Sequence, residues 1–295
     1  MADLLSRCRP SDVVTILFSV FLASLTLFFY SEIPSADNLI VIYGSLAFFQ
    51  SALVYLSRVN SFMRIARDII FPVICVLIIF DSLGLVVKNV NPQDLDYLLI
   101  RLDYLIFGFY PTVELEKMMT PILTDILQVA YSTYYFLPIT LGIALKVKGM
   151  KEEFEKSLFL ILLCFYLSYV GYILVPALGP RYAMEHLQET ALAGFLFSDV
   201  IQGILNMLEG VKRDAFPSGH TAIALMVLFL SFRYVRRLFW LMFIPVMLLV
   251  FATVYCRYHY VVDVVGGVLL TLVTIVGGEV YYKLHKRISN EPPIQ

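Results

Sequence analysis

Long apolar runs alternate with short polar segments along almost the whole chain. Eight of these runs approach or exceed the roughly 18 to 20 residues that a helix needs to cross a bilayer. The predicted spans are 13–30, 38–57, 69–87, 124–145, 157–176, 219–236, 238–256 and 259–282. The pattern therefore predicts an all-α fold, a multi-pass transmembrane helix bundle of about eight spans.

Residues 88–123 break this pattern, because charged side chains are interspersed among the apolar ones. Asp94, Asp96, Arg101 and Asp103 lie between apolar residues at helical spacing. Such a segment is more typical of an amphipathic helix in the membrane interface than of a span. We expect this interfacial helix at about 94–109.

Composition agrees with a membrane protein. The chain has 295 residues, of which 60% are hydrophobic and 15% charged, whereas soluble domains carry about 25% charged residues. The net charge of −1 gives no electrostatic case for a nucleic-acid partner. The four cysteines are scattered without the spacing of a zinc site. We see no linker or repeat, and expect a single integral membrane domain over 1–295, with its catalytic core at about 95–280.

The distribution of basic residues predicts the orientation, since cytoplasmic loops are enriched in Lys and Arg. With eight spans both termini share a side, and 15 of the 22 basic residues fall on it: Arg7, Arg9, Arg58, Arg64, Arg67, Lys146, Lys148, Lys151, Lys156, Arg233, Arg236, Arg237, Lys283, Lys286 and Arg287. We therefore predict cytoplasmic termini, in the cytoplasmic or plasma membrane.

The polar stretch YCRYHYVVDVVGG contains the first candidates for chemistry. His259 and Asp263 are four residues apart, on one face of a helix. A carboxylate there can accept a hydrogen bond from the imidazole Nδ1 and leave Nε2 as a nucleophile or base. Arg257 precedes them at the membrane surface, where a fixed cation could hold a phosphate. A polar helix cap beside an ordinary ion pair is the competing interpretation, although Asp263 lies inside an apolar run.

The stretch FPSGHTA is typical of a helix start, with Ser218 as N-cap. Free amides at a helix N-terminus, including that of Gly219, form an anion site, and His220 would lie in the first turn above it. The alternative is a capped helix with an incidental histidine. A third piece, VPALGPRY, places Arg181 at the end of a span, where an arginine that anchors the span at the membrane boundary is the favoured interpretation when this piece is taken alone.

Other residues have more ordinary interpretations. Tyr131, Tyr134 and Tyr135 form a helical stripe near a span and are best explained by an interfacial aromatic belt, although they could line a lipid pocket. Gly266 and Gly267 follow Asp263 and are expected to allow close helix packing.

The three polar pieces share the non-cytoplasmic face in this topology. Together they supply two histidines, two arginines, a hydroxyl and helix-terminal amides, a set suited to phosphoryl transfer without a metal. One imidazole would attack phosphorus, the other would protonate the leaving oxygen, and cations and amides would stabilise the developing charge. No metal or organic cofactor is expected.

Arg181, the PSGH of residues 217–220 and the R-x-H-x-x-x-D of residues 257–263 resemble the three motifs of the type-2 phosphatidic acid phosphatase superfamily, which includes the vanadium haloperoxidases. The third motif of that family has five residues between Arg and His, so Thr253 holds its arginine position here. The first motif has a lysine, absent from residues 171–180, and a proline where Tyr182 stands. GPRY, FPSGHTA and RYHYVVDVVGG are most similar to the inositol phosphorylceramide synthase-like branch.

The resemblance implies roles for the matching residues. His259 would be the nucleophile, Asp263 its orienting partner and His220 the general acid. Arg181, Ser218 and Gly219 would hold the phosphate, and Arg257 would do so by its proximity to His259. The implied function is transfer of a phosphoryl or phospho-headgroup from a phospholipid donor, through a phosphohistidine, to a lipid hydroxyl.

Three alternatives stay open at this point. The acceptor could be water, which would make the protein a lipid phosphate phosphatase. A non-catalytic transporter that binds phospholipid headgroups is more distant, because the chain shows no repeat and its polar groups cluster near one interface. An inactive scaffold is disfavoured because both histidines and the aspartate are present.

Overall fold

The computed structural model describes residues 8–196, 198–208 and 213–290, and within these ranges the chain is helical without strands. Among these residues, seven helical segments are long and apolar enough to cross a membrane. A further apolar helix, Gly219–Tyr234, is shorter. The seven are Pro10–Phe28, Ala36–Leu56, Ser61–Val90, Pro121–Val147, Lys151–Leu174, Arg236–Tyr255 and Val261–Ile288. The predicted all-α, multi-pass bundle is confirmed.

The first half of the chain consists of α2 (Pro10–Phe28), α3 (Ala36–Leu56), α4 (Ser61–Ile65), the π-helical turn η1 (Ala66–Ile70), α5 (Phe71–Val90), α6 (Asp96–Phe107), α7 (Pro111–Glu114), η2 (Leu115–Met118), α8 (Pro121–Ser132), η3 (Thr133–Phe136) and α9 (Leu137–Val147). The second half consists of α10 (Lys151–Leu174), α11 (Pro180–Ala183), η4 (Glu185–Leu187), α12 (Ser198–Leu208), α13 (Gly219–Tyr234), α14 (Arg236–Tyr255) and α15 (Val261–Asn290).

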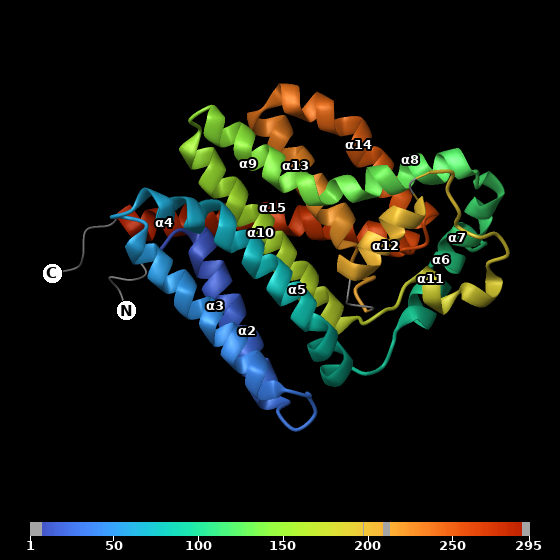
Figure 1. Cartoon of the computed structure of the whole chain (residues 1–295), viewed down its shortest axis with the longest axis horizontal. Helices are drawn as coiled ribbons and strands as arrows, with labels where there is room; N and C mark the ends of the chain where they lie inside the picture. The colour runs from blue at the N-terminus through green and yellow to red at the C-terminus, as the bar shows by residue number, and fades with distance from the viewer. Residues whose placement is uncertain (1–7, 197, 209–212, 291–295) are drawn as a thin grey trace.

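Helix α10 lies at the centre of the bundle (Figure 1). One of its faces packs against α9, α13 and α15, and α14 completes the core that includes Phe159 and Cys164. Its other face packs with α2 and α5 around a second core that includes Tyr166 and Tyr169. Helix α10 therefore joins an N-terminal group of helices to the C-terminal group that carries the predicted site.

Helix α13 is shorter than the predicted span 219–236 and is largely buried, with side chains such as Ile223 and Met226 fully enclosed. At about 1.5 Å per residue, its 16 residues do not reach across the roughly 30 Å hydrocarbon core of a bilayer. The irregular segment before it consequently lies within the bundle, where protein groups satisfy its backbone.

Two predicted elements differ in detail from those observed. The predicted span 124–145 is interrupted by the 3-10 turn η3, between α8 and α9. The predicted interfacial helix at 94–109 is present as α6, but its Asp96 and Asp103 are buried at 6% and 2% exposure. The acidic face of α6 is therefore directed into the protein and not toward water.

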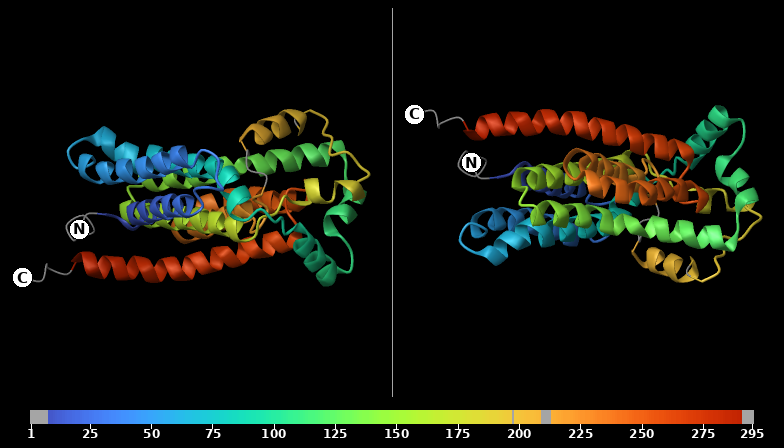
Figure 2. Two further views of the ribbon diagram at one scale, coloured as in Figure 1. Left: turned by 90° about the horizontal axis from the view of Figure 1, so that it is seen from below. Right: turned by 90° about the horizontal axis from the view of Figure 1, so that it is seen from above.

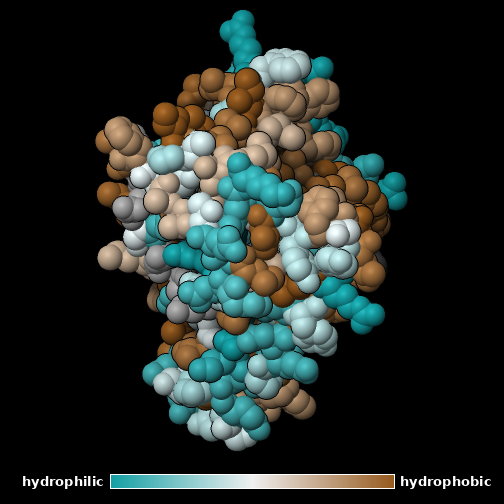
Figure 3. Space-filling view, turned by 90° about the vertical axis from the view of Figure 1, so that its right-hand side faces the viewer, coloured by the Kyte–Doolittle hydropathy of each residue, from teal (hydrophilic) through white to brown (hydrophobic). Residues whose placement is uncertain are grey.

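The two ends of the bundle hold different elements. Helix α2 begins and α15 ends at one end, whereas α6, α7 and α11 gather at the other (Figures 1 and 2). Viewed from the latter end, hydrophilic residues cover the middle of the molecule and hydrophobic residues flank them (Figure 3). We call the end where α2 begins and α15 ends the terminal end. The end where α6, α7 and α11 gather is the loop end.

A buried ionic cluster ties helices together at the terminal end. Asp12, only 1% exposed, accepts hydrogen bonds from Gln50 at 2.7 Å and from Arg67 Nε at 3.1 Å, and a further one from Arg67 Nη2. Arg9 Nη1 lies 2.9 Å from Asp68 in the same region. The pairing joins α2, α3 and η1 where charged groups would otherwise be buried alone.

Candidate active site

The two predicted catalytic histidines lie side by side at the loop end. His220 comes from the first turn of α13 and His259 from the segment between α14 and α15. Their ring centroids are 5.8 Å apart, and the residues are 9% and 4% exposed. They are 39 positions apart in the sequence, so this contact is produced by the fold.

The orientation of the His259 ring is set by two acceptors. Its Nδ1 lies 2.8 Å from the carbonyl oxygen of Ala215, which can only accept, so Nδ1 carries the proton. The Oδ2 atom of Asp263 is 3.6 Å from the same nitrogen and accepts the amide of Tyr260 at 2.7 Å. The sequence predicted Asp263 as the hydrogen-bond acceptor. In the structure the backbone carbonyl makes the shorter bond and Asp263 contributes charge, and both leave the Nε2 lone pair available.

The charge around His259 favours its protonated form. Burial by itself lowers the pKa of His259, but the Asp263 carboxylate, the charge of Asp214 and the Ala215 carbonyl outweigh it. The pKa of His259 is therefore raised above its ordinary value of 6.5. A positive charge that develops on this ring would be stabilised in place.

His220 is held against two tyrosine rings. Tyr131 of α8 stacks on it at a centroid distance of 4.4 Å, and Tyr134 of η3 lies 4.2 Å away. The Tyr131 hydroxyl is also 3.3 Å from His220 Nδ1. The expected interfacial aromatic belt is wrong for these two tyrosines, because they turn inward and position the histidine. The 3-10 turn that interrupts α8 and α9 places Tyr134 there.

Ser218 caps α13 as predicted, since its Oγ accepts the amide of Thr221 at 3.3 Å. Its own amide donates to the Asp263 carbonyl at 3.0 Å, which ties the start of α13 to that of α15. The Tyr172 hydroxyl approaches Gly219 so closely that a Cβ there would lie 2.2 Å from it. The absence of a side chain at Gly219 therefore makes room for Tyr172.

The predicted close packing at the glycine pair is confirmed. A Cβ on Gly267 would lie 2.6 Å from the Ser218 carbonyl oxygen, and one on Gly266 would lie 2.8 Å from the Phe216 ring. Both contacts would force the surroundings to move, because the first is with backbone and the second with a ring. Helix α15 consequently reaches the segment before α13 at van der Waals distance.

Arg181 reaches the site through the aromatic stack. Its amide donates to the Arg257 carbonyl at 2.9 Å, which fixes α11 beside the His259 segment. Its guanidinium lies 6.0 Å from the ring centroid of Tyr258, and that ring stacks on Tyr131 at 4.4 Å. Because Tyr131 also stacks on His220, a single row of rings connects Arg181 with the histidine pair.

Arg257 is held by other partners than the sequence suggested. Its Nη2 donates to Glu116 at 2.8 Å and to the Thr190 carbonyl at 2.6 Å, and the residue is 6% exposed. Its φ of 63° is in the left-handed region, which residues other than glycine seldom adopt. A phosphate contact from Arg257 Nη2 would require the ligand to take the place of Glu116.

Sequence reasoning did not identify Asp96 as part of the site. Its two carboxylate oxygens accept the amides of Leu178 at 2.8 Å and Gly179 at 2.9 Å. The Tyr260 hydroxyl donates to the same carboxylate at 2.8 Å. Asp96 thereby joins the loop that carries Arg181 to the segment that carries His259.

Asp103 likewise fixes the backbone of the site, in its case at the start of α15. Its carboxylate accepts the amides of Val261 at 3.0 Å and Val262 at 2.9 Å, the first residues of α15. A carboxylate is favourable at this positive end of the helix dipole. Burial raises the pKa of Asp103 and its two amide donors lower it, with burial dominant. Asp103 positions the turn between His259 and Asp263.

The spacing of these residues could have revealed them. Asp96, Leu99 and Asp103 are three and four residues apart and therefore share one face of α6. Leu99 is 2% exposed, so this face is the buried one. Carboxylates on the apolar face of an amphipathic helix are costly unless hydrogen-bond donors meet them. This placement distinguishes Asp96 and Asp103 from Asp94, which is partly exposed and pairs with Arg213.

The assembled site offers a nucleophilic nitrogen, a second imidazole and cations in an enclosed setting. Within the part of the chain that the structure describes, no three His, Cys, Asp or Glu side chains are grouped so that they could hold a metal ion. Two imidazoles at this distance have the chemistry for nucleophilic attack and proton transfer.

Comparison with known proteins gives a family for this arrangement. The model of the PAP2 superfamily matches residues 99–277, more than half of the chain and all three predicted motifs. A "PA-phosphatase related-family protein" of Dictyostelium discoideum is 27% identical over 112 residues, which are 37% of this chain and 20% of that protein. No solved structure gave a significant match. On the family match, this chain belongs to the PAP2 superfamily.

Proposed function

We propose that this membrane protein transfers a phosphoryl group from a phosphorylated lipid through a covalent phosphohistidine. The observation that carries the proposal is the pair of buried imidazoles with centroids 5.8 Å apart, one of them with its Nδ1 proton fixed on the Ala215 carbonyl. Such a pair can contact one phosphorus group from two sides, with His259 as nucleophile and His220 as general acid.

In the first step the lone pair of His259 Nε2 attacks phosphorus, and the bond from phosphorus to the leaving oxygen breaks. His220 gives its proton to that oxygen, so the leaving group departs as a neutral alcohol. In the second step the hydroxyl of an acceptor attacks phosphorus and gives its proton to His220. The phosphorus–nitrogen bond breaks, and both histidines return to their starting state. Asp263 stabilises the charge on His259 throughout.

The phosphate would be held by groups around this pair. Arg181 supplies a guanidinium next to the aromatic row, and the start of α13 supplies the amide of Gly219 with the helix dipole behind it. The Ser218 amide is already bound to the Asp263 carbonyl, so Ser218 contributes by capping this helix start. Arg257 Nη2 joins them only if the ligand displaces Glu116, with which it is paired. We assign Arg181 the larger share of phosphate binding for that reason.

The proposal has two versions, which differ in whether a lipid hydroxyl or water accepts the phosphoryl group. The motifs GPRY, FPSGHTA and RYHYVVDVVGG resemble those of inositol phosphorylceramide synthase-like enzymes, which favours a lipid hydroxyl as acceptor and a phospholipid as headgroup donor. The name of the Dictyostelium relative refers to a phosphatase, which favours water as the acceptor. Both reactions use the same two histidines.

We further propose that the loop end faces away from the cytoplasm. The reason is the distribution of Lys and Arg, 15 of 22 of which lie on the predicted side of the termini. The headgroup would then enter the site from the non-cytoplasmic face. Labelling of a cysteine introduced at Glu185, near Arg181, with an impermeant thiol reagent in intact cells tests this orientation.

A lipid-product assay tests the reaction. Purified protein receives a labelled phosphoinositide or phosphatidylglycerol, with and without ceramide or diacylglycerol. A transferase forms a new phospholipid only when the acceptor lipid is present. Release of free phosphate or headgroup phosphate at the same rate without acceptor would contradict the transferase proposal and support the phosphatase.

The variant His259→Ala separates an enzyme from a lipid-binding transporter. An enzyme that uses this nitrogen as nucleophile loses turnover by about 10⁴-fold or more and still binds lipid. Trapping of a labelled phosphohistidine, stable to base and labile to acid, by rapid denaturation of the original protein during turnover would support the intermediate. Turnover within a few-fold of the original protein in His259→Ala would remove the proposal.

A further inference from the structure

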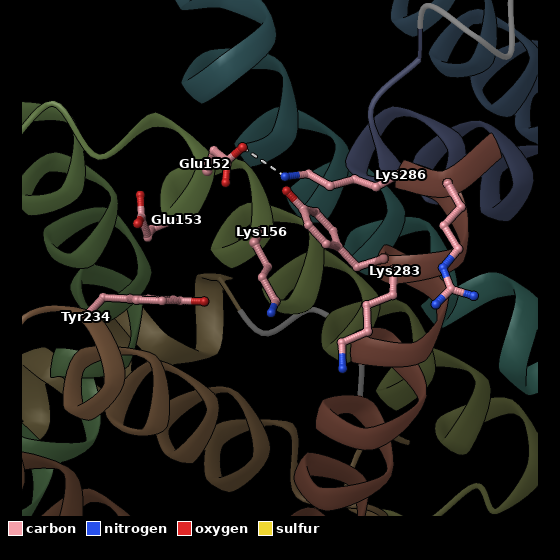
Figure 4. Close-up of a pocket in the computed structure, with 8 residues that line it drawn as sticks. Glu152, Glu153, Lys156, Tyr234, Lys283 and Lys286 are labelled. Atoms are coloured by element: carbon pink, nitrogen blue, oxygen red, sulfur yellow. Dashed lines mark hydrogen bonds and ion pairs between the residues drawn. The ribbon is translucent and has the colours of Figure 1, made fainter. Parts of the chain in front are cut away.

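The terminal end contains a cleft of about 420 Å³ at the opposite end from the histidines. It lies between the start of α10, the end of α13 and the end of α15. Four cations and two carboxylates line it: Lys156, Lys283, Lys286, Arg287, Glu152 and Glu153. Figure 4 shows Lys156, Lys283 and the Tyr234 hydroxyl extending into the same space. The lining therefore has a net positive charge.

Ion pairs within the protein neutralise only part of this charge. Lys156 lies 2.6 Å from Glu279, and Lys286 lies 2.9 Å from Glu152. Lys283 and Arg287 make no ion pair with any of the residues that the structure describes. These two are four residues apart and lie on one face of α15, so they offer two adjacent cations, without a counter-charge among the described residues, at one edge of the cleft.

The cleft adjoins a surface suited to an acyl chain. Val276, Val280 and Leu284 form a stripe along α15 at four-residue spacing and are 66%, 54% and 50% exposed. Lys283 follows Val280 by three residues, and Arg287 follows Leu284 by three, so each cation neighbours the stripe. A lipid lying along the stripe would bring its headgroup to the cleft.

We propose that this cleft binds a phosphate group, either of an anionic phospholipid in the adjoining leaflet or of a soluble phosphate. Charge-assisted hydrogen bonds from Lys283, Arg287 and Lys156 would hold its oxygens, with the Tyr234 hydroxyl as a further donor. The site is separate from the histidine pair and does not depend on the reaction proposed above. Clusters of basic residues at the end of a membrane helix bind anionic headgroups in this way.

The test measures binding to the full chain in the His259→Ala background, in which the proposed turnover is absent. The probes are neutral-detergent micelles containing phosphatidylglycerol, the same micelles with phosphatidylcholine, and inorganic phosphate, with bound ligand counted by native mass spectrometry. The double variant Lys283→Ala/Arg287→Ala should bind phosphatidylglycerol about 30-fold more weakly, since each Lys or Arg contributes about five-fold near an anionic lipid surface.

The matched control is Arg58→Ala/Arg64→Ala, which removes two exposed cations outside the cleft and should change binding much less. Phosphatidylglycerol binding that depends on Lys283 and Arg287 identifies a lipid as the ligand, and phosphate binding with the same dependence identifies a soluble anion. An equal loss of affinity in the control variant would overturn the proposal. So would affinities for phosphatidylglycerol and phosphate that are the same with and without the Lys283→Ala/Arg287→Ala change. Circular dichroism of both variants excludes unfolding as the cause.

Discussion

Carboxylates at the two ends of this bundle are satisfied by different partners. At the terminal end, Asp12 and Asp68 pair with the guanidinium groups of Arg67 and Arg9. At the loop end, Asp96 and Asp103 accept backbone amides from the segments that carry Arg181 and His259. The first arrangement neutralises charge between helices, whereas the second fixes the path of irregular backbone.

The difference follows from what each end must bury. Helix ends that meet inside the bundle bury charged side chains, which need a counter-charge. Irregular loops that meet inside the bundle bury free amides, which need acceptors. Loss of a terminal-end carboxylate partner should therefore cost stability alone, and loss of a loop-end carboxylate should cost turnover as well.

The largest effect on stability is expected from Arg67→Met at the terminal end. This change leaves the Asp12 carboxylate buried without its main partner, and breaking a buried pair costs roughly 3–5 kcal/mol. The kcat of the folded protein should stay unchanged because the histidine pair lies at the other end. Unfolding in mixed micelles measures the first quantity, and the lipid-product assay measures the second. A large fall in kcat with normal stability would contradict this separation of the two ends.

Asp103→Asn should lower both quantities at the loop end. An asparagine offers one oxygen to two amides, so the start of α15 shifts, and a displacement of about 1 Å at a catalytic group can cost about 10²-fold in rate. The unpaired amide adds a loss of roughly 1–3 kcal/mol in stability. Steady-state kinetics and unfolding on the same preparation distinguish this from Arg67→Met. Unchanged kcat would show that Asp103 is structural alone.

Gly267→Ala tests the contact between α15 and the α13 cap. A Cβ at this position would lie 2.6 Å from the Ser218 carbonyl, and overpacking of this kind costs roughly 1–3 kcal/mol. Gly277→Ala is the matched control in the same helix, because nothing lies within 4 Å of its Cβ position. The control should be neutral or stabilising by up to about 1 kcal/mol. Equal losses of stability in both variants would show that the loss comes from alanine in the helix and not from the contact with Ser218.

The smallest expected effect is a shift in pH dependence. The nucleophile must be neutral, so turnover should rise with pH through the raised pKa of His259, above its ordinary 6.5. The stabilising contribution of the protonated ring is complete below pH 6.5 and is lost over the same interval. Asp263→Asn removes the main cause that raises this pKa, and the residual activity should rise at lower pH. A pH–rate profile unchanged in this variant would exclude His259 as the titrating group.

Much of the fold and the histidine pair could be predicted from the sequence. Apolar run length defines spans directly, and PSGH and the His259/Asp263 spacing carry local signals of a helix cap and an i,i+4 pair. The contact between Ala215 and His259 could not be predicted, because it joins a backbone carbonyl to a ring across forty-four positions and any residue type supplies a carbonyl. The inward direction of Tyr131 depends on the 3-10 turn after α8, for which the sequence contains no clear mark.

Helix α10 fixes the distance between the basic cleft at the terminal end and the start of α13 near the histidines. Lys156 at one of its ends lines the basic cleft, and Tyr172 at the other contacts Gly219, about 24 Å away along an unbroken helix. One inserted residue in between would rotate Tyr172 by about 100° relative to Lys156 and withdraw its hydroxyl from the start of α13. The separation between the two ends is thus a fixed number of residues, and a bilayer of different thickness would have to be met by tilting the molecule as a unit.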